Sequence, residues 1–194
     1  MRADPVIITG TGLIALAALP PASPLLEARL PTHILSQYPV VIAGGAVIGA
    51  RLARDRPAPW TAAPALLAVI LTLAFWLLPR WIDASLTDPA TRVAKIASLA
   101  CLAGLPLGWG WVQAGMVLRG FLIANAAAML AVMGWLLLAV PSRLCSAYLL
   151  TDQRLAGQGL LIAAALLVIG SLGGAMIARD TGMRDRTSGH RTVN

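Results

Sequence analysis

Charged residues are scarce in this chain of 194 residues: they make up 12% of it, whereas hydrophobic residues make up 58% and the mean hydropathy is +0.79. Soluble globular domains carry about 25% charged residues. The polar segments between the apolar runs are also too short to bury a core of their own. The composition therefore predicts an integral membrane protein without a soluble domain.

Charge is missing above all from six windows of 21 to 24 residues each. About 20 apolar residues cross a bilayer core as a helix, and the windows lack the alternating polarity of membrane β-strands. We therefore expect an all-α polytopic transmembrane helical bundle of about six helices over residues 1–178, followed by a disordered, basic cytoplasmic tail at 179–194. The expected spans are 5–26, 30–50, 57–79, 96–118, 120–142 and 155–178.

The fifteen Lys and Arg residues are scattered among short loops, which argues against a nucleic-acid partner. With the N-terminus inside, nine of them lie on the cytoplasmic side and six outside, Lys95 among the latter, so both termini are predicted to be cytoplasmic. The expected location is a bacterial-type inner membrane. Asp4 and Pro5 disrupt the basic start that a signal peptide carries, which argues against cleavage. Whether residues 1–18 are removed stays open.

Catalytic motifs are absent as well. The sequence contains no HExxH, GxSxG, Walker or Rossmann pattern, so we expect no enzyme activity. Copper(I) would have to use soft ligands, and the candidates are His33, Met129, Met133 and Cys145. Methionines at helical spacing are usually packing residues, so the expectation is that no cofactor is bound.

Polar side chains gather near the outer ends of three windows. His33 and Gln37 open the second window, Asp83 follows the third, and Asp152 and Gln153 lie just before the sixth. With a cytoplasmic N-terminus these positions share the outer side, and we interpret them as a partner-binding patch. We expect no ionisable group deep in the membrane, which argues against a transporter.

Glycines recur at four-residue spacing within two windows, as Gly45 with Gly49 and Gly170 with Gly174. Small residues at this spacing let transmembrane helices approach each other closely. We therefore expect a tight bundle with little room for a wide aqueous pore.

Three segments share their order and several residues with one known family. "THILSQYPVVIAGGAVIG" is similar to a helix with histidines and a glutamine before an apolar run, and "LPRWIDASLTDPATR" to a loop with Leu-Pro, an aspartate and a second proline. "TDQRLAGQGLLIAAALLVIG" matches a last-helix signature at Asp152, Gln153, Ala156 and Gly157. Together these segments, 53 of the 194 residues, resemble the CtaG-like assembly factors of cytochrome c oxidase.

This resemblance implies about seven spans, several membrane histidines and a role in maturing the copper site or subunits of the oxidase. Here only His33 is retained in that region, and Tyr38 stands near the place of a second histidine. The resemblance therefore predicts a factor that assembles or stabilises a respiratory oxidase through contacts with its subunits or other membrane proteins, surrounded by membrane lipids. The alternatives are a permanent accessory subunit of a respiratory membrane complex and, with less support, a small-solute or metal permease.

Overall fold

Helices form every regular element in the described part of the chain, which confirms the all-α bundle. The structure, a computed structural model, describes residues 4–142 and 148–189, with side chains up to residue 174. The helices are α1 (Pro5–Ala18), α2 (Ala22–Glu27), α3 (Leu30–Thr32), α4 (Tyr38–Arg54), α5 (Ala62–Trp76), α6 (Pro79–Thr87), α7 (Pro89–Ser98), α8 (Leu105–Gln113), α9 (Met116–Ala139) and α10 (Leu150–Gly189), joined by the π-helical segments η1 (His33–Gln37) and η3 (Leu99–Gly104) and the 3-10 turn η2 (Pro59–Thr61).

Five helical stretches are long and apolar enough to cross a membrane, one fewer than expected. The first predicted span, 5–26, forms α1 instead, whose 14 residues extend about 21 Å and fall short of the ~30 Å hydrocarbon core. α1 ends because Leu19 is extended, as residues before a proline tend to be. The five stretches are Leu30–Arg54, Pro59–Trp76, Pro89–Gln113, Met116–Ala139 and Leu150–Gly174.

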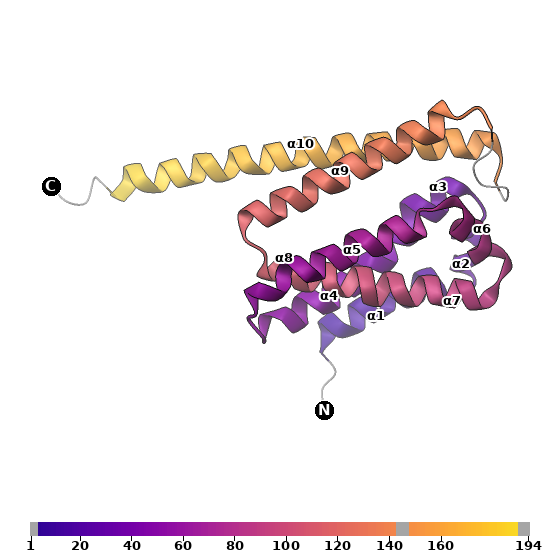
Figure 1. The fold of residues 1–194 in the computed structure, drawn as a ribbon. Helices are drawn as coiled ribbons and strands as arrows, with labels where there is room; N and C mark the ends of the chain where they lie inside the picture. Colours follow the sequence, from indigo (N-terminus) through magenta and orange to yellow (C-terminus); the bar gives the residue numbers. More distant parts are fainter. Residues whose placement is uncertain (1–3, 143–147, 190–194) are drawn as a thin grey trace.

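The start of α1 and the end of α10 lie on the same side of the bundle (Figure 1). α1 runs antiparallel to α4, and Nε of Arg51, near the end of α4, lies 2.8 Å from Oδ2 of Asp4 at the start of α1. We call this side of the bundle the terminal side and the opposite one the distal side. This arrangement agrees with the prediction that the two termini lie on one side of the membrane. That this side is cytoplasmic stays a prediction.

The third of the five spanning stretches begins at Pro89, well before the predicted start at residue 96. Asp88 caps it by accepting hydrogen bonds from the backbone N–H groups of Ala90 and Thr91, and a proline suits the first helical position. Lys95 therefore lies inside a spanning helix, so its predicted place in an outer loop is wrong.

Close backbone contacts hold α1, α4 and α8 together. A Cβ atom on Gly49 would lie 2.0 Å from the Leu105 carbonyl oxygen, and one on Gly45 would lie 2.4 Å from a carbonyl oxygen of η3. Gly10 and Gly44 face each other in the same way between α1 and α4. Only a residue without a side chain permits such an approach, so the packing role predicted for Gly45 and Gly49 is confirmed.

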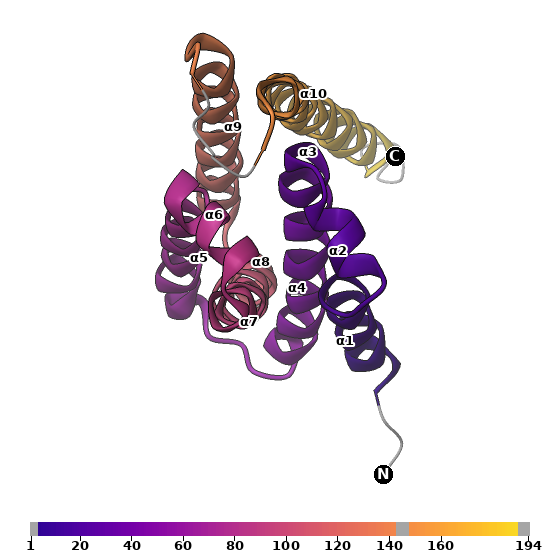
Figure 2. The same cartoon turned by 90° about the vertical axis from the view of Figure 1, so that its right-hand side faces the viewer.

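The helices α9 and α10 form a hairpin that lies above the rest of the bundle in Figure 2. They meet at Gly134 and Gly157, and α10 contacts the bundle at α3 and η1 on the distal side. Toward the terminal side the hairpin spreads: from 165 to 174 most side chains of α10 are exposed. Gly170 and Gly174 have open space where a Cβ would stand, so within the described residues their predicted packing role is wrong.

Beyond the membrane-spanning stretch, α10 continues as a helix to Gly189. The predicted disordered tail is therefore wrong for residues 179–189, whereas 190–194 lie outside the described residues. The helix thus projects from the terminal side of the bundle (Figure 1).

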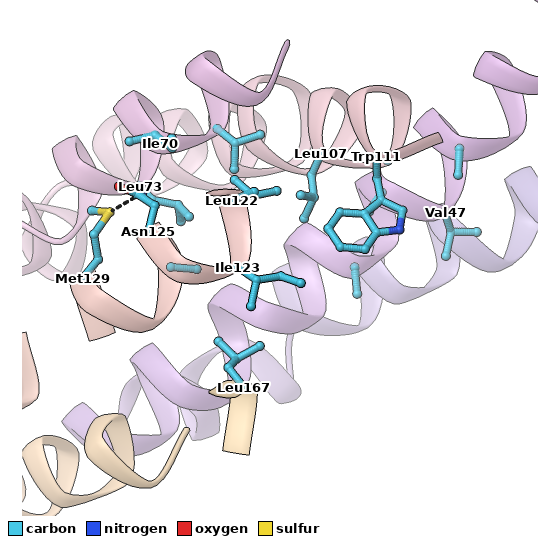
Figure 3. Close-up of a pocket in the computed structure, with 16 residues that line it drawn as sticks. Val47, Ile70, Leu73, Leu107, Trp111, Leu122, Ile123, Asn125, Met129 and Leu167 are labelled. Carbon is cyan, nitrogen blue, oxygen red and sulfur yellow. Dashed lines mark hydrogen bonds between the residues drawn. The ribbon is translucent and has the colours of Figure 1, made fainter. Parts of the chain in front are cut away.

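A cavity of about 590 Å³ opens between the hairpin and the bundle (Figure 3). Side chains of α4, α5, α8 and α9 line it, and Leu167 of α10 borders it. Apart from the amide of Asn125, the lining is made of aliphatic residues, a tryptophan and Met129. The cavity is therefore an apolar space at the junction of the two parts of the molecule.

Candidate functional site

Five polar side chains from four separate segments meet on the distal side of the bundle. They come from the end of α2, from η1, from the middle of α7 and from the residues just before α10. Each has an exposed fraction of 7% or less. This group, called the buried polar network below, consists of Glu27, His33, Gln37, Lys95 and Tyr148.

Lys95 is the centre of the buried polar network. Its Nζ lies 3.0 Å from Oε1 of Glu27, 2.8 Å from Nε2 of His33 and 3.2 Å from Oε1 of Gln37. An ammonium group has three N–H donors, so each donor has one acceptor. A buried charge is tolerated only when it is paired and hydrogen-bonded, and Lys95 meets both conditions.

The hydrogen bonds fix the tautomer of His33. The Tyr148 hydroxyl donates to the backbone carbonyl of Glu27 at 2.9 Å, because a carbonyl oxygen can only accept. The hydroxyl oxygen then accepts from Nδ1–H of His33 at 2.7 Å. Nε2 is left as the acceptor for Lys95. His33 is thus a neutral link between a lysine and a tyrosine.

Glu27 supplies the counter-charge. Its Oε1 accepts from Lys95 and, at 3.1 Å, from Nε2 of Gln37, and its Oε2 lies 3.3 Å from Nε of Arg92. The same Gln37 amide donates to the carbonyl of Ala17 at 3.1 Å, which connects the network to the end of α1. Arg92 is 42% exposed, so it joins the buried carboxylate to the surface.

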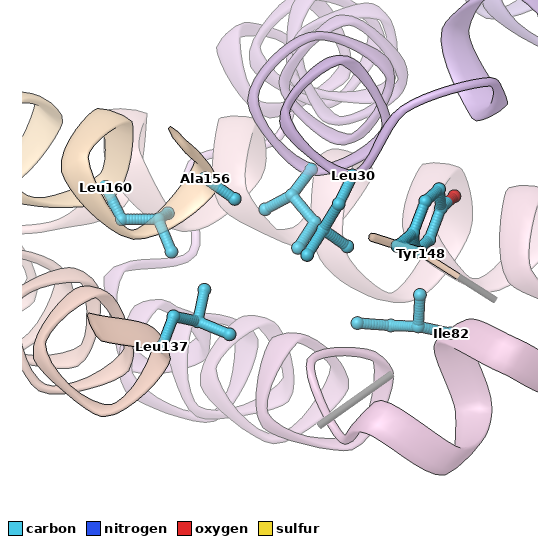
Figure 4. Close-up of a cluster of buried hydrophobic side chains, with 7 residues drawn as sticks. Leu30, Ile82, Leu137, Tyr148, Ala156 and Leu160 are labelled. Carbon is cyan, nitrogen blue, oxygen red and sulfur yellow. The ribbon is translucent and has the colours of Figure 1, made fainter. Parts of the chain in front are cut away.

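Tyr148 ties the hairpin to the network. Its ring belongs to a cluster of buried apolar side chains contributed by both parts of the molecule (Figure 4). Its hydroxyl, as described above, bonds to α2 and η1. The apolar partners in this cluster are Leu30, Ile34, Ile82, Leu137, Ala156 and Leu160.

The members of the buried polar network satisfy one another's hydrogen-bonding groups. Among the described residues, no buried side-chain nitrogen or oxygen lacks a hydrogen-bond partner. The arrangement is therefore that of an internal tie between α2, η1, α7 and the hairpin.

Sequence reasoning missed the central pair of this network. It placed Lys95 in a loop, whereas Lys95 lies buried within the candidate span Pro89–Gln113, paired with Glu27. The absence of an ionisable group deep in the membrane stays a prediction. One signal could have found Lys95. Asp88 followed by Pro89 is a helix-start pattern, and it places Lys95 about 9 Å into the helix.

The predicted partner-binding patch is wrong for three of its members. His33, Gln37 and Gln153 have exposed fractions of 2% or less, so they cannot present a polar surface to a partner. Gln153 instead donates to the carbonyl of Leu137 at 3.0 Å, across the hairpin turn. Asp83 and Asp152 are half-buried.

The predicted copper candidates are not arranged as one site among the described residues. Both ring nitrogens of His33 are engaged in the buried polar network. Met129 lines the apolar cavity and accepts a 3.5 Å hydrogen bond from Asn125, and Met133 packs against the cluster of Figure 4. Cys145 lies outside the described residues. That the protein binds no copper stays a prediction.

Comparisons with known proteins do not identify a family for this chain. No protein-family model matches it, and neither the curated proteins nor the solved structures give a match. The similarity to CtaG-like factors therefore stays a prediction from the sequence. The geometry shows a membrane protein with an internal polar tie, an apolar cavity and an exposed helix.

Proposed function

We propose that this chain is an integral membrane factor that assembles or stabilises a respiratory cytochrome c oxidase through protein–protein contacts. The observation that carries the proposal is the spanning part of α10 between 165 and 174, which is mostly exposed. Transmembrane helices associate through small residues that permit close packing. Gly170 and Gly174 present such residues with no neighbour within the described part of the chain.

The two other features of the molecule favour contact over turnover. The buried polar network is closed on itself, and the cavity is lined almost entirely by apolar groups. A permease would need polar groups along a pathway for its solute. The oxidase as the partner is supported by the sequence resemblance alone.

Co-purification tests the proposal. The chain would be tagged at its N-terminus, expressed in a bacterium with a haem-copper oxidase and purified in a mild detergent. We expect oxidase subunits in substoichiometric amounts, and at least a several-fold smaller amount with the double variant Gly170→Leu and Gly174→Leu. Gly12→Leu in α1 is the matched control, because Gly12 is also an exposed glycine with open space around it.

The possible outcomes separate the alternatives. Recovery in equal amounts with the mature oxidase would identify a permanent accessory subunit. No respiratory subunit with the unchanged chain would refute the proposal. Equal recovery from the double variant and the control would show that the partner does not use α10.

A further inference from the structure

An arginine stands at the terminal-side mouth of the apolar cavity. Arg119 shares a face of α9 with Ile123 and Ala126, which line the cavity, because residues three and four apart are neighbours on a helix. The Arg119 guanidinium carbon lies 5.4 Å from the ring centre of Trp111, another lining residue, and its Nε donates to the Trp111 carbonyl at 3.0 Å. Its position is therefore fixed against the cavity wall.

The charge of this arginine is not neutralised by the side chains that the structure describes. Within the described residues, Nε is the Arg119 nitrogen that donates a hydrogen bond, and the two terminal nitrogens make none. The side chain is half-exposed. Asp4 and Asp55, acidic residues on the same side, both pair with Arg51. A guanidinium with free terminal N–H groups matches the geometry of a phosphate.

The distance from Arg119 to the far end of the cavity equals about one leaflet. From Arg119 to Met129, the lining residue of α9 farthest along the helix, ten residues rise about 15 Å. This is half of the ~30 Å hydrocarbon core. The walls are apolar along this length and offer one amide, that of Asn125, which suits an acyl chain.

We infer that the cavity binds one anionic phospholipid from the terminal-side leaflet, with its phosphate at Arg119 and an acyl chain reaching toward Asn125 and Met129. The apolar walls of the cavity take the chain, and the positive charge of Arg119 favours a lipid of net negative charge over a zwitterionic one. The lipid fills the space between the hairpin and the bundle. This site does not depend on which protein partner α10 contacts.

Native mass spectrometry of the full chain tests the lipid site. Delipidated protein in mild detergent would be titrated with phosphatidylglycerol and, separately, with phosphatidylcholine of the same long acyl chains. We expect one high-affinity phosphatidylglycerol, bound about fivefold more tightly than phosphatidylcholine, which is the preference that one arginine near the membrane surface provides.

Two charge variants and one lipid variant make the test specific. Arg119→Gln is expected to abolish the headgroup preference. Arg54→Gln is expected to keep it, since Arg54 is an exposed arginine on the same side and does not line the cavity. A short-chain phosphatidylglycerol is expected to bind at least tenfold more weakly, and this comparison requires no change in the protein.

Three results would overturn the inference. The first is equal affinity of the unchanged protein for both headgroups. The second is a preference that persists in Arg119→Gln. The third is equal binding of short-chain and long-chain phosphatidylglycerol, which would show that the cavity takes no acyl chain.

Discussion

The bundle formed by α1–α8 and the hairpin formed by α9 and α10 use the same apolar, glycine-containing helices but are stabilised differently. In the bundle, glycines such as Gly49 touch the backbone of a neighbouring helix, and the buried polar network closes the distal side. In the hairpin, only Gly134 and Gly157 make such a contact among its described glycines, and Gly170 meets nothing there. A glycine pattern thus marks a surface suited to close packing without revealing whose helix packs on it.

Removal of the Lys95 ammonium should lower the free energy of unfolding more than any other change, because Lys95 is the centre of the buried polar network. Lys95→Met leaves the buried Glu27 carboxylate with Arg92 as its remaining cation. We expect a loss of about 3 kcal/mol or more in the free energy of unfolding. Denaturant titration in detergent, followed by circular dichroism, measures it. The double variant Lys95→Met with Glu27→Gln should recover much of the loss, and a single variant as stable as the parent would contradict the assigned pairing.

Glycine substitutions compare the two regions directly. Gly49→Ala should cost about 1 to 3 kcal/mol, because its Cβ would lie 2.0 Å from a carbonyl oxygen of α8. Gly170→Ala should change the stability of the isolated protein by about 0.5 kcal/mol or less, as surface substitutions usually do. The same unfolding titration measures both. Equal losses at the two positions would remove the distinction between the bundle and the hairpin.

Tyr148→Phe tests the connection between the regions. The change removes a hydroxyl that bonds to His33 and to the carbonyl of Glu27, and leaving these buried groups unpaired should cost about 1 to 2 kcal/mol. Hydrogen exchange should increase at residues 149–153, where the hairpin meets the bundle. Unchanged exchange at these residues would show that the hydroxyl does not tie the hairpin to the network.

A smaller effect than at Lys95 is expected at the exposed cap of α7. Hydrogen bonds from the Thr91 side chain, and from the backbone of Thr91 and Ala90, lower the pKa of Asp88 below its ordinary value of 3.8. A lowered pKa means that the cap stabilises the fold above pH 3.8 and loses this effect as the pH falls through the folded value. Asp88→Ala should therefore lower the thermal midpoint slightly at neutral pH. The difference from the parent should disappear in strong acid.

The sequence predicts the helical class and most spans, because a window of about 20 residues without charge indicates a helix surrounded by lipid. It fails at Lys95, since counting charge-free windows assigns every charged residue to a loop. Lys95 is buried because Glu27, which comes from a different helix, supplies its counter-charge. Such long-range pairing leaves no local pattern, and the same reason hides the inward orientation of His33 and Gln37.

The central claim is that the exposed part of α10, and not the buried polar residues, contacts the protein partner. A photo-crosslinking residue at Ile169 on α10, which is 65% exposed, tests it most directly, with Ile8 on α1, which is 58% exposed, as the matched position. In cells that assemble a haem-copper oxidase, we predict an adduct with an oxidase subunit from position 169 and none from position 8. No protein adduct from position 169, or equal adducts from both positions, would contradict the account.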